Sequence, residues 1–362
     1  MMRSGLLAMV MGIAALAATA ALAADKPAPP DMNQTVVFPG GIVADRDLIY
    51  AAIEGFRPLT LDIYQSPPKP NETPRPAIVF VHGGGWANGD ARHAANFDNF
   101  PAILAALAAK GYVVAGVNYR LAGEAHFPAA VQDAKSAVRW LRAHAIDYDI
   151  DTTRVMIWGM EAGGQIAAMV GTSCGVAALE PAADAKSKAP MASDCVQGVI
   201  DWYGPTDLAG WDADSGRAPE PGAATRLGAY LGCELADCAP GIVHAASPLS
   251  YIESMSPPFL IQQGAADTLV PPAQSRKLYD ALHTQHVPSD LVVYPDVGQD
   301  FAKDGVPDAA VNAKAVADME DFIARTFPPA RPGANSPNGS VKAANSAKPR
   351  PTRSSAKSSR RK

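Results

Sequence analysis

The sequence has few of the residues that metal and cofactor sites require. Its 362 residues include four cysteines and seven histidines, and no Cys-x-x-Cys or His-x-x-x-His pair occurs. Zinc sites typically draw on such closely spaced ligands. The chain also lacks a phosphate-binding loop, a dinucleotide fingerprint after its first strand and the motifs of nucleic-acid-binding folds. The sequence therefore predicts that the protein has no metal site, no cofactor and no nucleic-acid-binding fold.

Long apolar runs are absent beyond the amino terminus. There, Arg3 precedes an almost uninterrupted apolar stretch, Leu6–Leu22, and small residues surround Ala23. This order is typical of a secretory signal peptide, which is removed. No later segment approaches the ~18 apolar residues of a transmembrane helix. We expect residues 1–23 to be a signal peptide and the mature protein to be secreted or periplasmic, with no transmembrane segment.

Export permits disulfides, and the four cysteines are enough for two. Cys174–Cys195 would span a Pro-, Ala- and Lys-rich excursion, and Cys233–Cys238 would close a short turn. Four cysteines allow three connectivities, so the spacing favours this pairing without excluding the others.

Acidic residues are missing from the last segment of the chain. Residues 330–362 contain nine Lys/Arg, no Asp/Glu and a single branched aliphatic residue, although the whole chain carries a net charge of −5. Such a segment buries too little apolar surface to fold by itself, so we expect a disordered basic tail. It either folds back onto the acidic body or adheres to an anionic envelope surface or nucleic acid, and the first alternative is favoured.

Residues 34–328 show no internal repeat and no linker, so they predict one domain. Seven apolar runs have the length of strands: Leu59–Tyr64, Ala77–Val81, Tyr112–Asn118, Val155–Trp158, Val196–Trp202, Phe259–Gln263 and Leu291–Tyr294. Five stretches have helical spacing: Phe97–Lys110, Ala129–Ala145, Gly163–Thr172, Pro272–Gln285 and Ala309–Thr326. This alternation predicts an α/β fold with a doubly wound, mostly parallel sheet and helices on both faces. Its functional crevice is expected at the carboxyl ends of the strands.

Two glycine-rich turns follow predicted strands. Gly159–Gly163 reads Gly-Met-Glu-Ala-Gly between an apolar strand and a small-residue helix. The related turn Gly-x-Ser-x-Gly presents a nucleophilic serine, and here Glu161 stands at its tip. His82–Trp86 reads His-Gly-Gly-Gly-Trp after the strand Ala77–Val81. Its glycines let successive N–H groups point into one cavity, which suits a developing oxyanion.

With these two turns, the chain resembles the α/β-hydrolase superfamily. Within it, the chain is most similar to the exported carboxylesterases related to hormone-sensitive lipase and bacterial feruloyl esterases. The resemblance covers roughly residues 45–328. Four further segments carry it: Asn118–Leu121, Asp201–Asp207, Ala246–Pro248 and Gly264–Pro271.

The resemblance implies roles for individual residues. Asp267 takes the place of the acid of a catalytic triad, and Glu161 takes the place of the nucleophile. The base position, where the family has Gly-His-x-Phe, holds Gln299, and none of the seven histidines lies in the loop Tyr294–Phe301. The implied oxyanion donors are three N–H groups, those of Gly83, Gly84 and Ala162.

These substitutions remove the serine-esterase mechanism. Acyl transfer of that kind needs a hydroxyl, an imidazole and a carboxylate, and only Asp267 remains. Glutamine cannot accept or return a proton. Glu161 as a nucleophile is disfavoured, because release of the resulting enzyme ester needs a water activated by the missing histidine. On ordinary esters, its attack would give a mixed anhydride, which is a poor route. A further hypothesis is that the Gln299 amide bridges Glu161 and Asp267, either for general acid/base chemistry or as a static network. We also expect the Glu161 carboxylate to point into the glycine-loop donors.

The sequence thus predicts an exported, carboxylesterase-type protein that is catalytically disabled and at most binds a small acyl or aromatic ester-like ligand. Trp86, Trp202 and Tyr203 are candidate pocket residues. The alternative is a hydrolase that acts on carboxylic esters by a weak or rebuilt mechanism. His82 would then be the nearest base, although a structural role in holding the glycine loop is favoured. A third hypothesis is an envelope-adhesion role of the basic tail, and the sequence indicates no oligomeric state.

Overall fold

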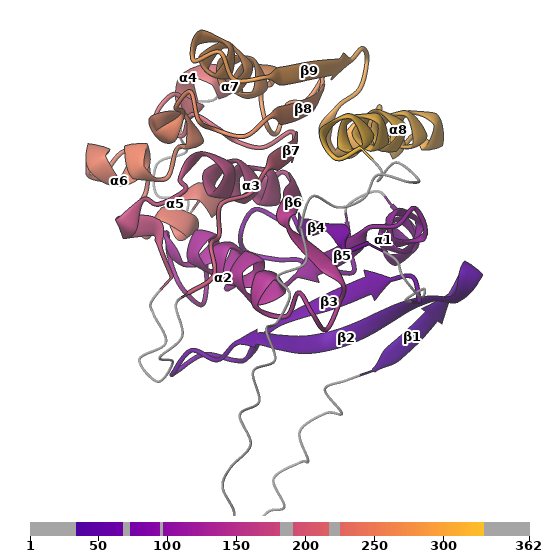
Figure 1. Ribbon diagram of the computed structural model, residues 1–362. Helices are drawn as coiled ribbons and strands as arrows, with labels where there is room; N and C mark the ends of the chain where they lie inside the picture. The colour runs from indigo at the N-terminus through magenta and orange to yellow at the C-terminus, as the bar shows by residue number, and fades with distance from the viewer. Residues whose placement is uncertain (1–33, 68–72, 95–96, 182–190, 217–224, 329–362) are drawn as a thin grey trace, which may run out of the picture.

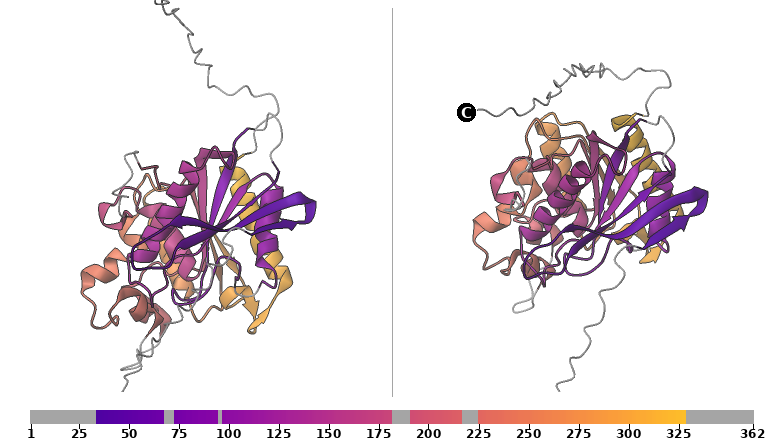
Figure 2. Two further views of the ribbon diagram at one scale, coloured as in Figure 1. Left: turned by 90° about the horizontal axis from the view of Figure 1, so that it is seen from below. Right: turned by 60° about the horizontal axis from the view of Figure 1, so that its bottom comes forward.

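The computed structural model describes residues 34–67, 73–94, 97–181, 191–216 and 225–328. The expected signal peptide, 1–23, and the expected basic tail, 330–362, lie outside the described residues. The described chain forms a nine-stranded sheet with the order β1-β2-β3-β5-β4-β6-β7-β8-β9. Helices lie on both faces of this twisted sheet (Figures 1 and 2), which confirms the predicted α/β-hydrolase class of fold.

The sheet is antiparallel at one edge and parallel elsewhere. Strands β1, β2, β3 and β5 pair antiparallel, whereas β5, β4, β6, β7, β8 and β9 pair parallel in that spatial order. The bounds are β1 Thr35–Phe38, β2 Ile42–Ala51, β3 Leu59–Gln65, β4 Arg75–Val81, β5 Val113–Val117, β6 Ile150–Met160, β7 Gly198–Trp202, β8 Phe259–Gly264 and β9 Ser289–Tyr294. A separate two-stranded ribbon consists of β10 Ala302–Lys303 and β11 Val306–Pro307. All seven expected strands are present.

The long helices divide between the two faces of the sheet. Helices α1 and α8 pack on one face, and α2, α3 and α7 pack on the other, as Figure 1 shows. The bounds are α1 Phe100–Ala109, α2 Ala129–Ala143, α3 Ala162–Thr172, α4 Trp211–Ser215, α5 Arg226–Leu231, α6 Pro240–Ala245, α7 Pro272–Thr284 and α8 Ala309–Thr326. The predicted apolar stripe of α2 is buried, including Val131, Val138 and Leu141. The structure therefore confirms the five expected helices.

Both disulfides join the cysteines that the spacing favoured. Cys174 pairs with Cys195, and Cys233 pairs with Cys238. The first links the end of α3 to the segment before β7, and the second closes the connection between α5 and α6.

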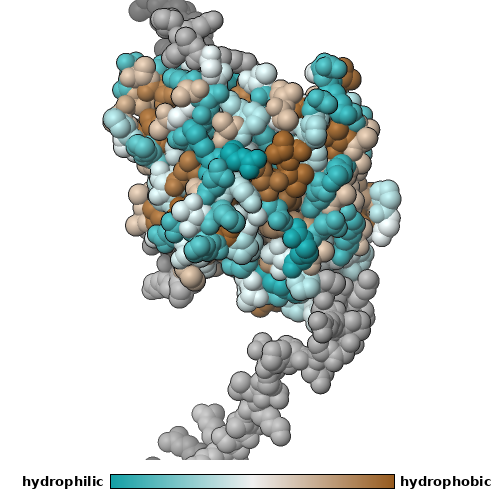
Figure 3. Space-filling model, turned by 90° about the horizontal axis from the view of Figure 1, so that it is seen from above, coloured by the Kyte–Doolittle hydropathy of each residue, from teal (hydrophilic) through white to brown (hydrophobic). Residues whose placement is uncertain are grey.

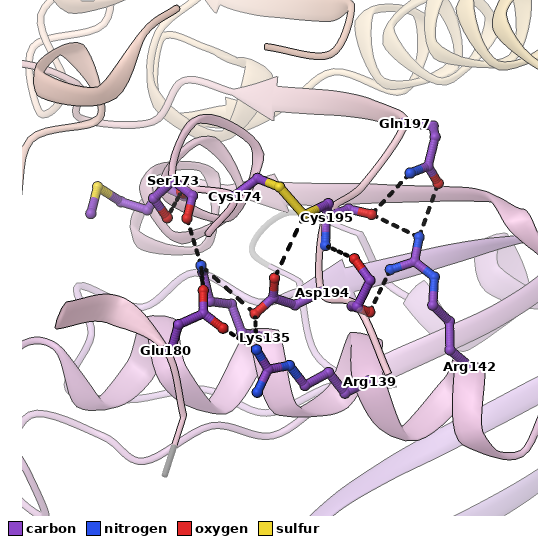
Figure 4. The surroundings of a disulfide bond; sticks show 11 residues. Lys135, Arg139, Arg142, Ser173, Cys174, Glu180, Asp194, Cys195 and Gln197 are labelled. Carbon is purple, nitrogen blue, oxygen red and sulfur yellow. Dashed lines mark hydrogen bonds and ion pairs between the residues drawn. A yellow bond between two sulfur atoms is a disulfide. The ribbon is translucent and has the colours of Figure 1, made fainter. Parts of the chain in front are cut away.

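A group of buried and partly buried charges lies beside the Cys174–Cys195 bond (Figure 4). Lys135 of α2 is completely buried and donates to Glu180 Oε1 at 2.9 Å and to the Ser173 carbonyl at 2.7 Å. Its Nζ also lies 3.7 Å from Asp194 Oδ2. Arg139, one turn further along α2, pairs with Glu180 and with Asp194. These contacts attach the segment between α3 and β7 to the face of α2.

No helix in the described ranges is long and apolar enough to cross a lipid bilayer. On the face shown in Figure 3, hydrophobic side chains form small separate patches between hydrophilic ones. Such scattered exposure is ordinary for a protein surface and needs no further explanation.

Candidate functional site

The turn between β6 and α3 holds Glu161 in a strained backbone conformation. Its φ and ψ are 51° and −118°, in a region that side-chain-bearing residues rarely adopt. Close backbone packing makes this turn possible, because a Cβ on Gly159 would stand 1.9 Å from the Gly163 carbonyl oxygen. A Cβ on Gly163 would stand 2.1 Å from the Val81 carbonyl oxygen of β4. Only glycine fits at both positions, so the sharp strand-to-helix turn expected from the sequence is present.

The glycine loop after β4 binds the Glu161 side chain. The Gly84 and Gly85 N–H groups each donate to Glu161 Oε2 at 2.7 Å. Positive φ angles of 104° at Gly84 and 61° at Gly85 turn these two amides toward the carboxylate. The expectation that Glu161 points into the glycine loop is confirmed.

The donors are one residue further along the chain than expected. We expected Gly83, Gly84 and Ala162, whereas Gly84 and Gly85 make the two hydrogen bonds. Gly83 faces the carboxylate with its α-carbon, since a Cβ there would stand 3.2 Å from Glu161 Oε2. Among the hydrogen bonds of the described residues, none joins the Ala162 N–H to this carboxylate. The sequence alone does not predict which loop N–H groups donate to Glu161. That choice depends on how the positive φ angles orient each peptide plane.

Asp267 lies in the loop that follows β8. Its Oδ1 accepts hydrogen bonds from the Leu269 N–H at 2.8 Å and the Val270 N–H at 3.0 Å. Its Oδ2 accepts from Gln263 Nε2 at 3.3 Å. The pKa of Asp267 is raised to about 6, mainly by burial and also by the nearby Asp300 carboxylate, although these hydrogen bonds oppose the shift.

Gln299 does not form the expected bridge between Glu161 and Asp267. Its Nε2 donates to Oδ1 of the next residue, Asp300, at 3.2 Å. The bridge is not formed: Asp267 Oδ1 accepts from its own loop, Asp267 Oδ2 accepts from Gln263 of β8, and the Gln299 amide donates to Asp300 instead. Asp300 also has a positive φ of 57° inside the short 3-10 turn Gln299–Phe301, and its carboxylate comes back against the Gln299 amide.

Asp300 is the site residue that the sequence interpretation missed. The pKa of Asp300 is raised to about 6 by burial and by the Glu161 carboxylate, while hydrogen bonds with Tyr203 and Gln299 act to lower it. Burial is the main cause of the raised pKa of the Tyr203 hydroxyl. The carboxylates of Asp300, Glu161 and Asp267 raise this pKa further. The structure thus gathers three carboxyl groups around Tyr203. The only sequence signal was an acidic residue beside the base position.

We expect this crowding to make stability depend on pH. A carboxyl whose pKa is higher in the folded than in the unfolded chain binds a proton on folding, so the free energy of unfolding falls as pH rises from about 4 to about 6. Asp300→Asn removes one such group. Its stability relative to the wild type should therefore be higher at about pH 7.5 than at about pH 4, by about 1–3 kcal/mol.

Chemical denaturation of both proteins at the two pH values measures this difference. Asp296→Asn is the matched control, since Asp296 is exposed on the same loop. An equal stability difference for Asp300→Asn at both pH values would contradict the prediction.

His82 holds the glycine loop and is electrically neutral. Its ring is buried, stacks on Tyr119 with centroids 4.3 Å apart, and places Nδ1 2.7 Å from the Gly83 carbonyl oxygen. Burial lowers the pKa of His82 to about 4. An Nδ1–H donating to Gly83 fits this geometry, so His82 occupies the structural role that the sequence favoured.

The candidate pocket aromatics are packed into the interior. Trp86 stacks on Tyr230 with centroids 4.5 Å apart, and its indole N–H donates to Gln165 Oε1 at 3.1 Å. Tyr203 packs edge-on against Phe301, and Trp202 is buried in β7. A cavity of about 430 Å³ opens elsewhere, between β8, β9, α7 and α8. None of the three site carboxyl groups lines it.

Comparison with known proteins places these features in a family. The BD-FAE family model matches residues 61–282, and the prolyl oligopeptidase family model matches residues 237–329. Esterase LipQ of Mycobacterium tuberculosis is 30% identical over 228 residues, which are 63% of this chain and 50% of that protein. The chain spans about half the length of LipQ and of the related esterase LipC.

Solved structures that are similar to this chain also include esterases. A bifunctional GH43-CE protein of Bacteroides eggerthii is similar with a TM-score of 0.63 and 28% identity, covering 78% of this chain and 38% of that one. Thermogutta terrifontis esterase 2, phosphonylated by cyclosarin, is similar with a TM-score of 0.61 and 25% identity, covering 77% of this chain and 93% of that one.

Proposed function

This chain belongs to the BD-FAE family and to the carboxylesterase group of α/β-hydrolases, and from that premise we propose that it binds an ester-like ligand without hydrolysing it. One observation carries the proposal. The Glu161 carboxylate accepts hydrogen bonds from Gly84 and Gly85, the donors that would otherwise stabilise an oxyanion. A negative charge fixed there repels a second one, so a tetrahedral oxyanion is not stabilised at this position.

The histidine that normally transfers the proton is also missing from the site. Gln299 occupies the base position and has no titratable group. His82 is neutral, but its Nδ1 faces the Gly83 carbonyl and its ring stacks on Tyr119, so it is committed to the loop. The pair that normally generates the attacking alkoxide is therefore replaced by a carboxylate and an amide.

The ligand we propose is a small acyl or aromatic ester-like molecule that contacts the glycine loop. The esterase relatives support the ester-like chemistry. We further propose that the protein acts outside the cytoplasm. Its two disulfides support this location, because reducing compartments disfavour such bonds.

A second candidate function is hydrolysis by a rebuilt mechanism. The pKa of Asp300 and that of Asp267 both rise to about 6, which is closer to neutrality than an ordinary carboxyl and suits a general base. A water activated by either group would be the nucleophile. This route still lacks free oxyanion donors, so the binding function is the one we favour.

Hydrolysis of 4-nitrophenyl acetate by the purified protein distinguishes the two. We expect the wild type, Glu161→Ala and Asp300→Asn to give the same rate as buffer within about twofold, since no residue pair supplies a nucleophile and a base.

The rebuilt mechanism predicts a different pattern. The wild type would exceed buffer, its rate would rise with pH through about 6 as the base ionises, and Asp300→Asn or Asp267→Asn would abolish it. That pattern would overturn the binding proposal.

A further inference from the structure

An arginine lies over the glycine loop beside the Glu161 site. Arg226, the first residue of α5, is exposed, and its Cδ lies 2.5 Å from where a Gly85 Cβ would stand. Its Nη1 lies 3.1 Å from the same point. The N–H of Gly85 binds Glu161 on one side while Arg226 covers the α-carbon. A single glycine thus separates the guanidinium from the carboxylate.

Several contacts anchor the short helix α5, which carries Arg226. Thr225 caps it by accepting a hydrogen bond from the Gly228 N–H at 2.8 Å, and the Thr225 hydroxyl donates to Glu234 at 2.8 Å. The Cys233–Cys238 bond closes the turn that follows. Tyr230 stacks on Trp86 of the glycine loop itself, which ties α5 directly to the site.

Within the described ranges, the guanidinium of Arg226 has the capacity to bind an anion. Among the residues that the structure describes, no side chain or carbonyl accepts a hydrogen bond from it, and no carboxylate forms an ion pair with it. Glu161 turns its Oε2 toward the backbone amides of Gly84 and Gly85 instead. Those amides are occupied, so Arg226 is the charged donor that remains at the loop. Its planar fork fits the two oxygens of a carboxylate.

We propose that Arg226 binds the carboxylate of an acyl or aromatic ligand whose remainder lies along the glycine loop. This inference rests on the proposed function and adds that the ligand carries a negative charge. In an ester hydrolase, donors of this kind receive the oxygen of the reacting carbonyl. Here Glu161 accepts from them, so the ligand carboxylate binds outside that place.

Binding of benzoate and of its uncharged analogue benzamide to the oxidised full chain tests the proposal by isothermal titration calorimetry. Benzoate should bind in the millimolar range, and benzamide about tenfold more weakly. Arg226→Gln should weaken benzoate binding about tenfold and leave benzamide unchanged, while Arg226→Lys should retain part of the affinity. Arg276→Gln is the matched control, because it removes the same charge from an exposed arginine on α7 and should have no effect.

Three results would overturn the inference: no benzoate binding, equal loss of both ligands in Arg226→Gln, or an equal effect of Arg276→Gln. The last would mean that only net charge matters. Hydrolysis of esters by the wild type would overturn the proposed function but not this inference. Carboxylate binding that depends on Arg226 would still stand.

Discussion

Glu161→Ser combined with Gln299→His is expected to raise the hydrolysis of 4-nitrophenyl acetate at least about 10³-fold over the wild type. Serine is shorter than glutamate and leaves the Gly84 and Gly85 N–H groups free to receive an oxyanion. The strained turn at position 161 is already formed and presents the side chain to these donors. Asp267 is held by its loop and supplies the carboxylate that orients an imidazole.

The two substitutions should act as a unit. Glu161→Ser alone provides a hydroxyl with no base, and Gln299→His alone provides a base with no nucleophile, so each single variant should stay near the background rate. Adding Asp267→Asn to the active pair should remove most of the gain, because the imidazole loses its orienting partner. Steady-state rates of these four variants and the wild type measure the effect.

A double variant that folds like the wild type, by circular dichroism and thermal unfolding, yet stays at background would refute this prediction. Position 299 would then be too far from position 161 for a nucleophile–base pair. The site would have diverged in its loop geometry as well as in its two side chains.

Lys135→Ala is expected to destabilise the fold by about 3 kcal/mol or more. The ammonium group is completely buried between Glu180, Asp194 and the Ser173 carbonyl (Figure 4). Removing it leaves two carboxylates near the Cys174–Cys195 bond, with Arg139 as the cation that still pairs with both among the described residues. Burial and the neighbouring Glu180 already raise the pKa of Asp194, so the lost cation increases an existing repulsion.

Urea denaturation of Lys135→Ala beside Lys314→Ala provides the measurement. Lys314 pairs with Asp318 on the surface of α8 and is 62% exposed, so its removal should cost less than about 1 kcal/mol. A loss below about 1 kcal/mol for Lys135→Ala as well would show that Arg139 alone neutralises both carboxylates.

The local pattern was enough to predict most of the fold. Apolar runs such as Ala77–Val81 and the stripe of α2 indicated strands and helices that the structure contains. Strands β1 and β2 were missed. In β2 the charged residues Asp45, Arg46 and Asp47 interrupt the apolar run, and the register with β3 shifts between Asp45 and Leu48. Pairing with a neighbour, rather than composition, makes that segment a strand.

The sequence by itself determined that the serine and histidine of a hydrolase are absent, where the strand-to-helix turn lies and which loops carry the site. Each of these follows from residue type and spacing along a short stretch of chain. Only the tertiary structure decided that Gly84 and Gly85 bind Glu161, that Gln299 contacts Asp300, and that Arg226 covers Gly85. The glycine loop and Glu161 are 77 residues apart in the chain, and positive φ angles set which amides face the carboxylate. Such contacts depend on backbone rotation and on the packing of distant segments, which no local pattern specifies.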